Sequence, residues 1–466
     1  MPGTADRIAF RRLSAARSAP ALLRSGCASV RGPSTLLRRA ITGPAQDWSD
    51  KAVYTRTRRP VEEATTLPGA VYHDEAFYQL EKTHVWRSSW VVAGELSELS
   101  KPGDLLPATV GGENIILAND NGTIRAFHNV CRHRGAQLVT EKCEKRRTIL
   151  CPYHRWGYAL DGRLVSTPLF DSDEARKAVP ENLRGKFTGY VKDFDKKEMG
   201  LFPVRVESAL GLIFVNLNGE APPLADWLGD LLPAVLEFRP VLETPGALVA
   251  ASKKTYDCKA NWKVLVENFL EYYHLPAVHP ALCNVSGVDE HERRQGKGMY
   301  MGFATYPLNG DSTAGPTPID PGRLPPFPGL RGANLQTAWH ICIFPNVFFS
   351  LYPDHFFRVV LTPHGPNRTI ESSTLFTHTS SVDASPEAPK VLEGMFKFWD
   401  AVNLEDIQIC ENVQVGTSST PYTGGRFSFR FEETIHRFQN MVVDKVLAEE
   451  GTRYRIPEGD SDYDAP

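Results

Sequence analysis

Seventeen residues separate the motif Cys131-Arg132-His133 from the motif Cys151-Pro152-Tyr153-His154, and these two motifs are the strongest indication of the fold of the first half of the chain. Each motif places one thiol and one imidazole in a short stretch that also contains glycine, at Gly135 and at Gly157. Two thiolates and two imidazoles fit a tetrahedral zinc site. They also fit a two-iron, two-sulfur cluster with the thiolates on one iron and the imidazoles on the other.

The local pattern favours the cluster over zinc and over four unrelated residues. A zinc finger typically carries its histidines together on a helix, about three to five residues apart. Here Cys and His alternate within each motif, and turn signals surround them: Asn121-Gly122 and Asp161-Gly162 each lie between apolar runs and predict hairpins. The predicted cluster ligands are Cys131, His133, Cys151 and His154.

A second group of polar residues lies on a predicted helix over residues 261–274. Its apolar residues form a stripe at helical spacing that ends at Tyr273. Glu267, Glu271 and His274 are spaced by four and three residues, so they are expected to share another face.

Two histidines are expected to converge where this helix ends. Pro276 disfavours the helical conformation at the preceding residue, which leaves His279 free to turn back toward His274. Two histidines supply two ligands of a facial triad for iron, which needs one further carboxylate. Histidines at this spacing are also common as structural or surface residues, but Glu271 favours ligation because carboxylates often orient ligand histidines.

The missing carboxylate is found in a third predicted helix, which begins near Ser385. Asp406 interrupts an apolar stripe on this helix, whereas Glu405 points off the stripe. A buried carboxylate without compensation is costly, so a metal or a buried salt bridge is expected beside it. The stripe advances by three or four residues through Leu392, Met395, Trp399, Val402, position 406, Ile409 and Val413.

These motifs together resemble the catalytic α-subunits of Rieske non-haem iron oxygenases, over roughly residues 70–440. Within that family the chain is most similar to the choline monooxygenase group, whose relatives act on glycine betaine and carnitine. The resemblance implies an α+β protein: a small all-β Rieske [2Fe-2S] domain and a helix-grip (START/Bet v 1-like) catalytic domain with an antiparallel sheet.

The resemblance also assigns roles to residues. Cys131 and Cys151 would hold one cluster iron, and His133 and His154 the other. His274, His279 and Asp406 would hold a mononuclear Fe²⁺, and Glu271 would be the catalytic residue bridging the cluster and the iron of neighbouring subunits. Arg155 stands where many relatives have glycine.

The implied function is oxidation of choline to betaine aldehyde hydrate, or of a related trimethylammonium compound, in glycine betaine biosynthesis. The oxidant would be O₂. Electrons would come from a ferredoxin or flavin reductase, since the chain shows no flavin or nicotinamide fingerprint. A homotrimer is implied. An aromatic-ring-hydroxylating α-subunit and a glycine betaine or carnitine oxygenase are alternatives; a non-enzymatic electron carrier is disfavoured by the intact triad.

Two sets of residues are candidates for recognition. A quaternary ammonium substrate favours aromatic faces, of which at most half on any strand can face one pocket. The candidate aromatic residues are Tyr272, Tyr273, Trp339, Phe344, Phe348, Phe349 and Tyr352. An acidic ferredoxin could dock on basic residues, although these could equally be solvated charges: Arg132, Arg134, Lys142, Lys145, Arg146 and Arg147.

The composition of the chain argues against several other classes of protein. Eight cysteines among 466 residues are too few for a disulfide scaffold, and a formal net charge of −3 argues against a nucleic-acid binder. The chain contains no run of about 18 or more apolar residues, so no membrane span is predicted. Residues 1–46 hold eight arginines, no lysine and one acid, a net +7, which leaves −10 for the rest.

This leader is typical of an organelle transit peptide, with the mitochondrial matrix slightly favoured over the chloroplast stroma; a disordered basic arm is the alternative. The predicted domains are residues 71–218 for the Rieske domain with flanking elements and 219–450 for the catalytic domain. Residues 451–466 are expected to form an acidic disordered tail.

Overall fold

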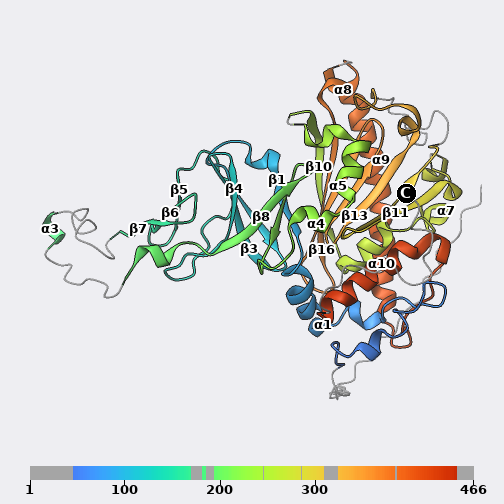
Figure 1. Ribbon diagram of the computed structural model, residues 1–466, viewed down its shortest axis with the longest axis horizontal. Coiled ribbons are helices and arrows are strands. Elements are labelled where there is room, and N and C mark those ends of the chain that lie inside the picture. The colour runs from blue at the N-terminus through green and yellow to red at the C-terminus, as the bar shows by residue number, and fades with distance from the viewer. Residues whose placement is uncertain are drawn as a thin grey trace, which may run out of the picture. The chain divides into compact units, whose positions relative to one another are not determined.

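The computed structural model describes residues 46–168, 181–184, 194–244, 246–284, 286–308, 324–383 and 386–448. The predicted leader, apart from Gln46, and the predicted acidic tail lie outside these residues. Three antiparallel sheets and the helices packed on them make up the described part (Figure 1). No helix among the described residues has the length and apolarity needed to cross a membrane.

Two of the sheets build the part that carries the Cys and His motifs. The six-stranded sheet has the order β1–β9–β8–β4–β3–β2. Its strands are β1 (Val91–Glu95), β9 (Leu212–Asn216), β8 (Pro203–Ala209), β4 (Thr123–His128), β3 (Glu113–Asp120) and β2 (Leu105–Val110). The three-stranded sheet comprises β5 (Thr148–Leu150), β6 (Gly157–Ala159) and β7 (Leu164–Ser166).

Both predicted hairpins are confirmed. Asn121 and Gly122 join β3 to β4 with φ values of 53° and 95°, the left-handed conformation that suits a two-residue hairpin turn. Gly162, with φ 90°, lies in the turn between β6 and β7.

The third sheet has seven strands in the order β10–β16–β15–β14–β13–β12–β11. Its strands are β10 (Leu248–Cys258), β16 (Thr369–His378), β15 (Phe356–Pro363), β14 (Val347–Leu351), β13 (Ala338–Ile343), β12 (Tyr300–Thr305) and β11 (His291–Gln295). The described α-helices are α1 (Glu75–Leu80), α3 (Glu181–Arg184), α4 (Leu224–Leu228), α5 (Leu231–Phe238), α6 (Trp262–Phe269), α7 (Leu275–Val278), α8 (Thr379–Asp383), α9 (Ala388–Thr417) and α10 (Phe429–Val446).

The long helix α9 changes its packing partner along its length. In its first half, Val391 and Met395 pack against residues of β15 and β16. In its second half, Cys410 and Gln414 are buried against α6 and the turn before α1. The buried face therefore rotates, and the predicted continuation of the apolar stripe is wrong at Val413, which is 42% exposed.

The predicted helix over residues 261–274 is also too long, because α6 ends at Phe269. The Glu271 carboxylate accepts hydrogen bonds from the backbone N–H groups of Tyr273 and His274, which competes with a continuing helix. A separate short helix, α7, then begins with Pro276 in its first turn, where a missing N–H costs nothing.

The segment before β1 packs on helix α6. The Lys263 ammonium of α6 forms an ion pair with Glu81, with Nζ 2.6 Å from Oε1 and both side chains fully buried. Trp86 contacts Trp262 edge to face, with ring centroids 5.0 Å apart. These flanking residues therefore extend the core of the seven-stranded sheet and its helices.

Candidate active site and cluster-binding loops

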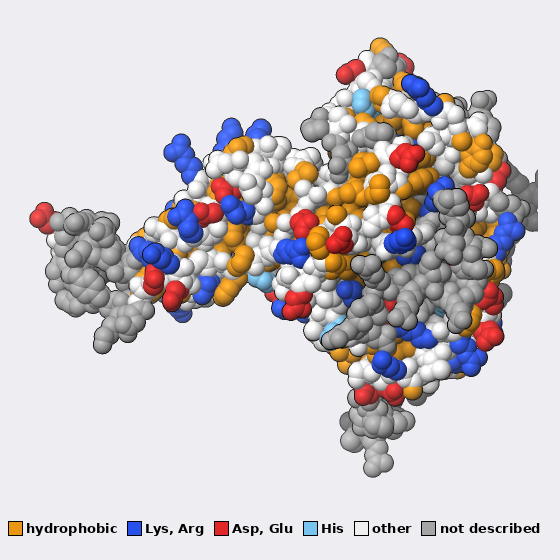
Figure 2. Space-filling model, viewed as in Figure 1, with side chains coloured by type: hydrophobic (Ala, Val, Ile, Leu, Met, Phe, Trp, Pro, Cys, Tyr) orange, Lys and Arg blue, Asp and Glu red, His pale blue; other side chains and the backbone are white. Residues whose placement is uncertain are grey.

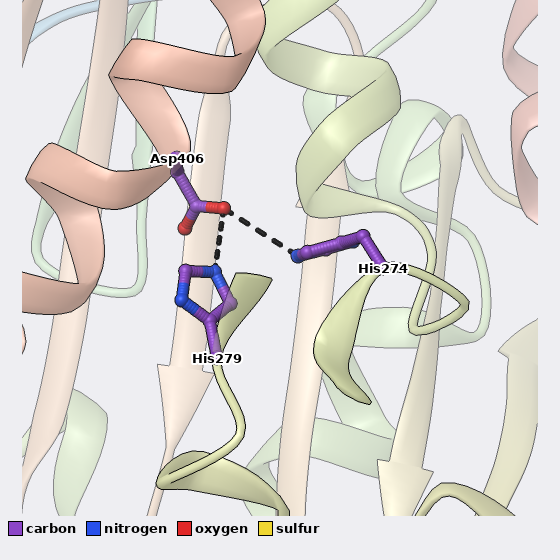
Figure 3. Close-up of side chains that lie close together, drawn as sticks. All are labelled: His274, His279 and Asp406. Atoms are coloured by element: carbon purple, nitrogen blue, oxygen red, sulfur yellow. Dashed lines mark hydrogen bonds and ion pairs between the residues drawn. The ribbon is translucent and has the colours of Figure 1, made fainter. Parts of the chain in front are cut away.

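Three of the predicted ligands converge beside α7 and α9. His274 precedes α7, His279 follows it, and Asp406 lies on α9 (Figure 3). The Asp406 Oδ1 atom is 2.8 Å from His279 Nε2 and 3.4 Å from His274 Nε2. One ligand atom of each residue lies within 4.8 Å of the other two, so a single metal ion can contact all three.

A second carboxylate orients each histidine. The His274 Nδ1–H donates to Glu271 at 2.5 Å, and the His279 Nδ1–H donates to Glu405 at 2.7 Å. Both rings therefore direct Nε2 toward Asp406, as expected of ligand histidines held by carboxylates. The expected face shared with Glu267 is wrong: that carboxylate is buried elsewhere and accepts a hydrogen bond from Tyr72.

The charges of these residues fit a divalent cation. Burial lowers the pKa of His274, but hydrogen bonds with Asp406 and Glu271 outweigh it and raise the pKa to about 9. Burial raises the pKa of Asp406, but hydrogen bonds from His274 and His279 outweigh it and lower the pKa. A divalent cation would likewise stabilise the Asp406 carboxylate and would bind both histidines in their neutral form.

The three predicted ligands line a cavity with a volume of about 140 Å³. Alternate residues of the sheet face it: Phe348 lines the cavity, whereas Phe349 packs beside Phe356. Of the candidate aromatic residues, Phe348 and Tyr352 line the cavity; Tyr273 is 58% exposed and Trp339 stacks on Phe238. The remaining aromatic lining comes from Phe269, Phe303, Phe357 and Trp399.

The two cluster loops have the same backbone design. The Cys131 N–H donates to Ala136 O at 2.8 Å and the Cys151 N–H to Trp156 O at 2.8 Å. The residue four positions after each cysteine, Gly135 or Arg155, donates its backbone N–H to the carbonyl oxygen of that cysteine. Both adopt positive φ, 71° and 59°, which is costless only for glycine.

The side chains of these loops suit the predicted cluster. Cys131 and Cys151 are 2% and 1% exposed, whereas the His133 and His154 rings are half-buried with centroids 4.6 Å apart. Burial raises the pKa of the Cys131 thiol, and the adjacent Cys151 thiol raises it further, so a cation is needed to hold both as thiolates. The Tyr158 hydroxyl lies 3.3 Å from Cys131 Sγ.

The basic residues near the loops divide into two groups. Arg132 donates to Gly200 O at 2.7 Å and Arg134 to the Tyr153 hydroxyl at 3.1 Å, so both have local structural contacts. The other four are exposed: Lys142, Lys145, Arg146 and Arg147. Figure 2 shows Lys and Arg side chains interspersed with acidic ones over this part of the molecule.

Comparison with known proteins assigns the class. Residues 89–181 match the Rieske [2Fe-2S] domain, and residues 245–448 match the catalytic domain of the ring hydroxylating alpha subunit. The chain belongs to the Rieske non-haem iron oxygenase α-subunits, and is an oxidoreductase whose cofactors are a [2Fe-2S] cluster and a mononuclear iron.

Three similar proteins are named as monooxygenases. The glycine betaine monooxygenase oxygenase subunit of Chromohalobacter salexigens is 28% identical over 410 residues, which cover 82% of this chain and 86% of the relative. The chloroplastic choline monooxygenase of Spinacia oleracea is 26% identical over 387 residues, covering 81% and 78%. A quaternary ammonium Rieske monooxygenase structure, described for carnitine oxidation and inter-subunit electron transfer, superposes with a TM-score of 0.66 at 24% identity, covering 82% and 95%.

Sequence reasoning missed several residues of the site, among them Glu405, Glu371 and Phe357. Glu405 was expected to point away, yet its carboxylate reaches His279 because that histidine approaches from beyond α7. Glu371 and Phe357 come from strands that carry no motif, and only the strand register places them in the cavity.

Proposed function

We propose that this protein is a monooxygenase of choline or a closely related trimethylammonium compound. The observation that carries the proposal is the cavity at His274, His279 and Asp406, whose lining includes six Phe, Tyr and Trp side chains. A cation that cannot donate hydrogen bonds is stabilised by aromatic faces. The relatives described above, named for choline and glycine betaine, support the same substrate class.

In this proposal the two histidines and the aspartate hold the mononuclear iron. Bound iron would supply O₂ activation, since a facial triad leaves coordination positions open. Glu271 and Glu405 hold the histidines in the tautomer that presents Nε2. For choline, one oxygen atom enters a C–H bond of the alcohol carbon, giving betaine aldehyde hydrate. The other oxygen atom leaves as water with two protons and two electrons.

Electron supply involves a second copy of the chain in this proposal. A solved relative is described for inter-subunit electron transfer, which supports a path from the cluster of one chain to the iron of another. A homotrimer in which one subunit's His154 lies near the next subunit's Glu271 would provide that path. The exposed lysines and arginines at positions 142, 145, 146 and 147 would receive a reduced ferredoxin or flavin reductase.

Product analysis by mass spectrometry tests the function. Iron-loaded protein receives O₂, reduced ferredoxin and, separately, choline, glycine betaine, carnitine or naphthalene. Betaine aldehyde from wild type and from the exposed-histidine control His364→Ala, but not from His274→Ala, is the expected result. Hydroxylated naphthalene without any ammonium product would replace this proposal with the ring-hydroxylating alternative.

We also propose that residues 1–46 direct the protein to an organelle, with the mitochondrial matrix favoured. The arginine-rich, acid-poor composition supports this. A fluorescent protein fused after residue 46 should enter the organelle, and a diffuse cytosolic signal would contradict the proposal.

A further inference from the structure

The cavity contains a buried carboxylate that does not belong to the predicted metal ligands. Glu371 lies on β16, lines the cavity and is 4% exposed. The Asn403 Nδ2 group donates to its Oε1 at 2.7 Å. Within the described ranges, no lysine or arginine forms an ion pair with it. A buried carboxylate in this setting normally requires a cationic partner.

We propose that Glu371 binds the cationic group of the substrate and selects ammonium compounds that carry no carboxylate. This inference rests on the function proposed above and deepens it. Burial raises the pKa of Glu371 to about 7, and the hydrogen bond from Asn403 opposes that rise. A cation bound in the cavity would favour the ionised carboxylate.

Aromatic side chains complete the cationic site. Trp399 lies one helical turn before Asn403 on α9 and also lines the cavity. Its ring centroid is 5.1 Å from that of Tyr352 and 5.3 Å from that of Phe357. These rings and the carboxylate supply the two kinds of attraction open to a methylated ammonium group.

The orientation of Trp399 is fixed from outside the cavity. Its Nε1–H donates to His355 Nε2 at 2.9 Å, and the His355 Nδ1–H donates to Asp354 at 2.7 Å. His355 and Asp354 are buried and do not line the cavity. The polar edge of the indole is therefore bonded away from the substrate, which leaves its apolar surface for the cavity.

Asn403 and Asp406 lie close together on α9, and both line the cavity. Asn403 and Asp406 are three residues apart, a rise of roughly 4.5 Å along the helix. The alcohol carbon of choline lies about 2.5 Å from its nitrogen, two bonds away. An ammonium group near Glu371 and Asn403 would thus direct the alcohol carbon toward the iron ligands.

A substrate carboxylate would find no lysine or arginine to pair with among the described residues of this cavity. The described residues that line it include Glu271, Glu371 and Asp406 but no lysine or arginine. A carboxylate of glycine betaine or carnitine would be desolvated beside like charges, which opposes binding. Choline carries a hydroxyl in place of that carboxylate.

Binding of two isosteres tests the inference. Calorimetry on the iron-loaded protein compares choline with 3,3-dimethyl-1-butanol, which has the same shape without the charge. Glu371→Gln should raise the Kd of choline at least about 30-fold and leave that of the neutral alcohol within about threefold. Ser372→Ala, the neighbouring β16 position on the opposite face of the sheet, is the matched control and should change neither. The ratio of the two Kd values does not depend on the folded fraction.

The outcomes separate the two proposals. Choline oxidation by wild type, with an unchanged choline Kd in Glu371→Gln, would overturn the role of Glu371 and leave the function standing. Wild-type affinity for glycine betaine equal to that for choline would overturn the selection against carboxylates. Failure of wild type to bind any ammonium compound would overturn the proposed function itself.

Discussion

Glu405→Ala should weaken iron binding at the mononuclear site. The Glu405 carboxylate accepts the Nδ1–H of His279 at 2.7 Å, and the His279 side chain is 1% exposed. Removing the carboxylate takes away the hydrogen bond that orients the ring at Nδ1 and lowers the basicity of Nε2. Hydrogen bonds to charged groups contribute about 1.5–3 kcal/mol when well shielded. Because the Glu405 side chain is 52% exposed, the lower part of that range applies, and roughly a tenfold loss of affinity is expected.

Competition with a chromophoric chelator measures this loss, with the visible absorbance of the cluster showing that the protein remains assembled. Glu393→Ala is the matched control: it is another exposed glutamate on α9, and it pairs with Lys397 rather than with a ligand. Equal iron affinities of the Glu405→Ala and Glu393→Ala proteins would refute the orienting role of Glu405.

Three further changes test other parts of the structure. Tyr158→Phe removes a hydrogen bond to the Cys131 thiol and should lower the cluster potential by roughly 20–65 mV, the equivalent of about 0.5–1.5 kcal/mol; redox titration showing no decrease would contradict this. Arg155→Gly should stabilise the protein by about 1 kcal/mol, because glycine adopts the positive φ of this position without strain. Gly135→Ala should destabilise it by a similar amount through φ alone, since a Cβ there meets no atom within 4 Å. Denaturant titration should therefore show changes of opposite sign in the free energy of unfolding. Lys263→Met should cost about 3–5 kcal/mol by leaving Glu81 buried and unpaired, and adding Glu81→Leu should restore most of it; an equally unstable double variant would contradict the account.

The parts of the site that lie in local motifs could be predicted from the sequence. The spacing of Cys131, His133, Cys151 and His154 was enough to choose a cluster over zinc, because paired loops encode their ligands locally. The Asn-Gly and Asp-Gly turns were equally local. Asp406 could be found because a carboxylate in an apolar stripe requires an explanation.

The remainder depends on tertiary contacts that no local pattern encodes. Helical periodicity continued α6 past Phe269, but the Glu271 side chain takes over the backbone N–H groups there. Val413 matched the spacing of the stripe, but α9 changes partners and exposes it. Glu371 could not be placed, because its position depends on the register of β15 and β16.

The most direct test of the account is a single turnover of pre-reduced, iron-loaded protein with choline and O₂, without any redox partner. The wild-type protein should reoxidise its cluster and release betaine aldehyde. Asp406→Ala, with its cluster reduced to the same extent, should release none. Betaine aldehyde from the Asp406→Ala protein, or cluster reoxidation by wild type with choline left unchanged, would contradict choline oxidation at this site.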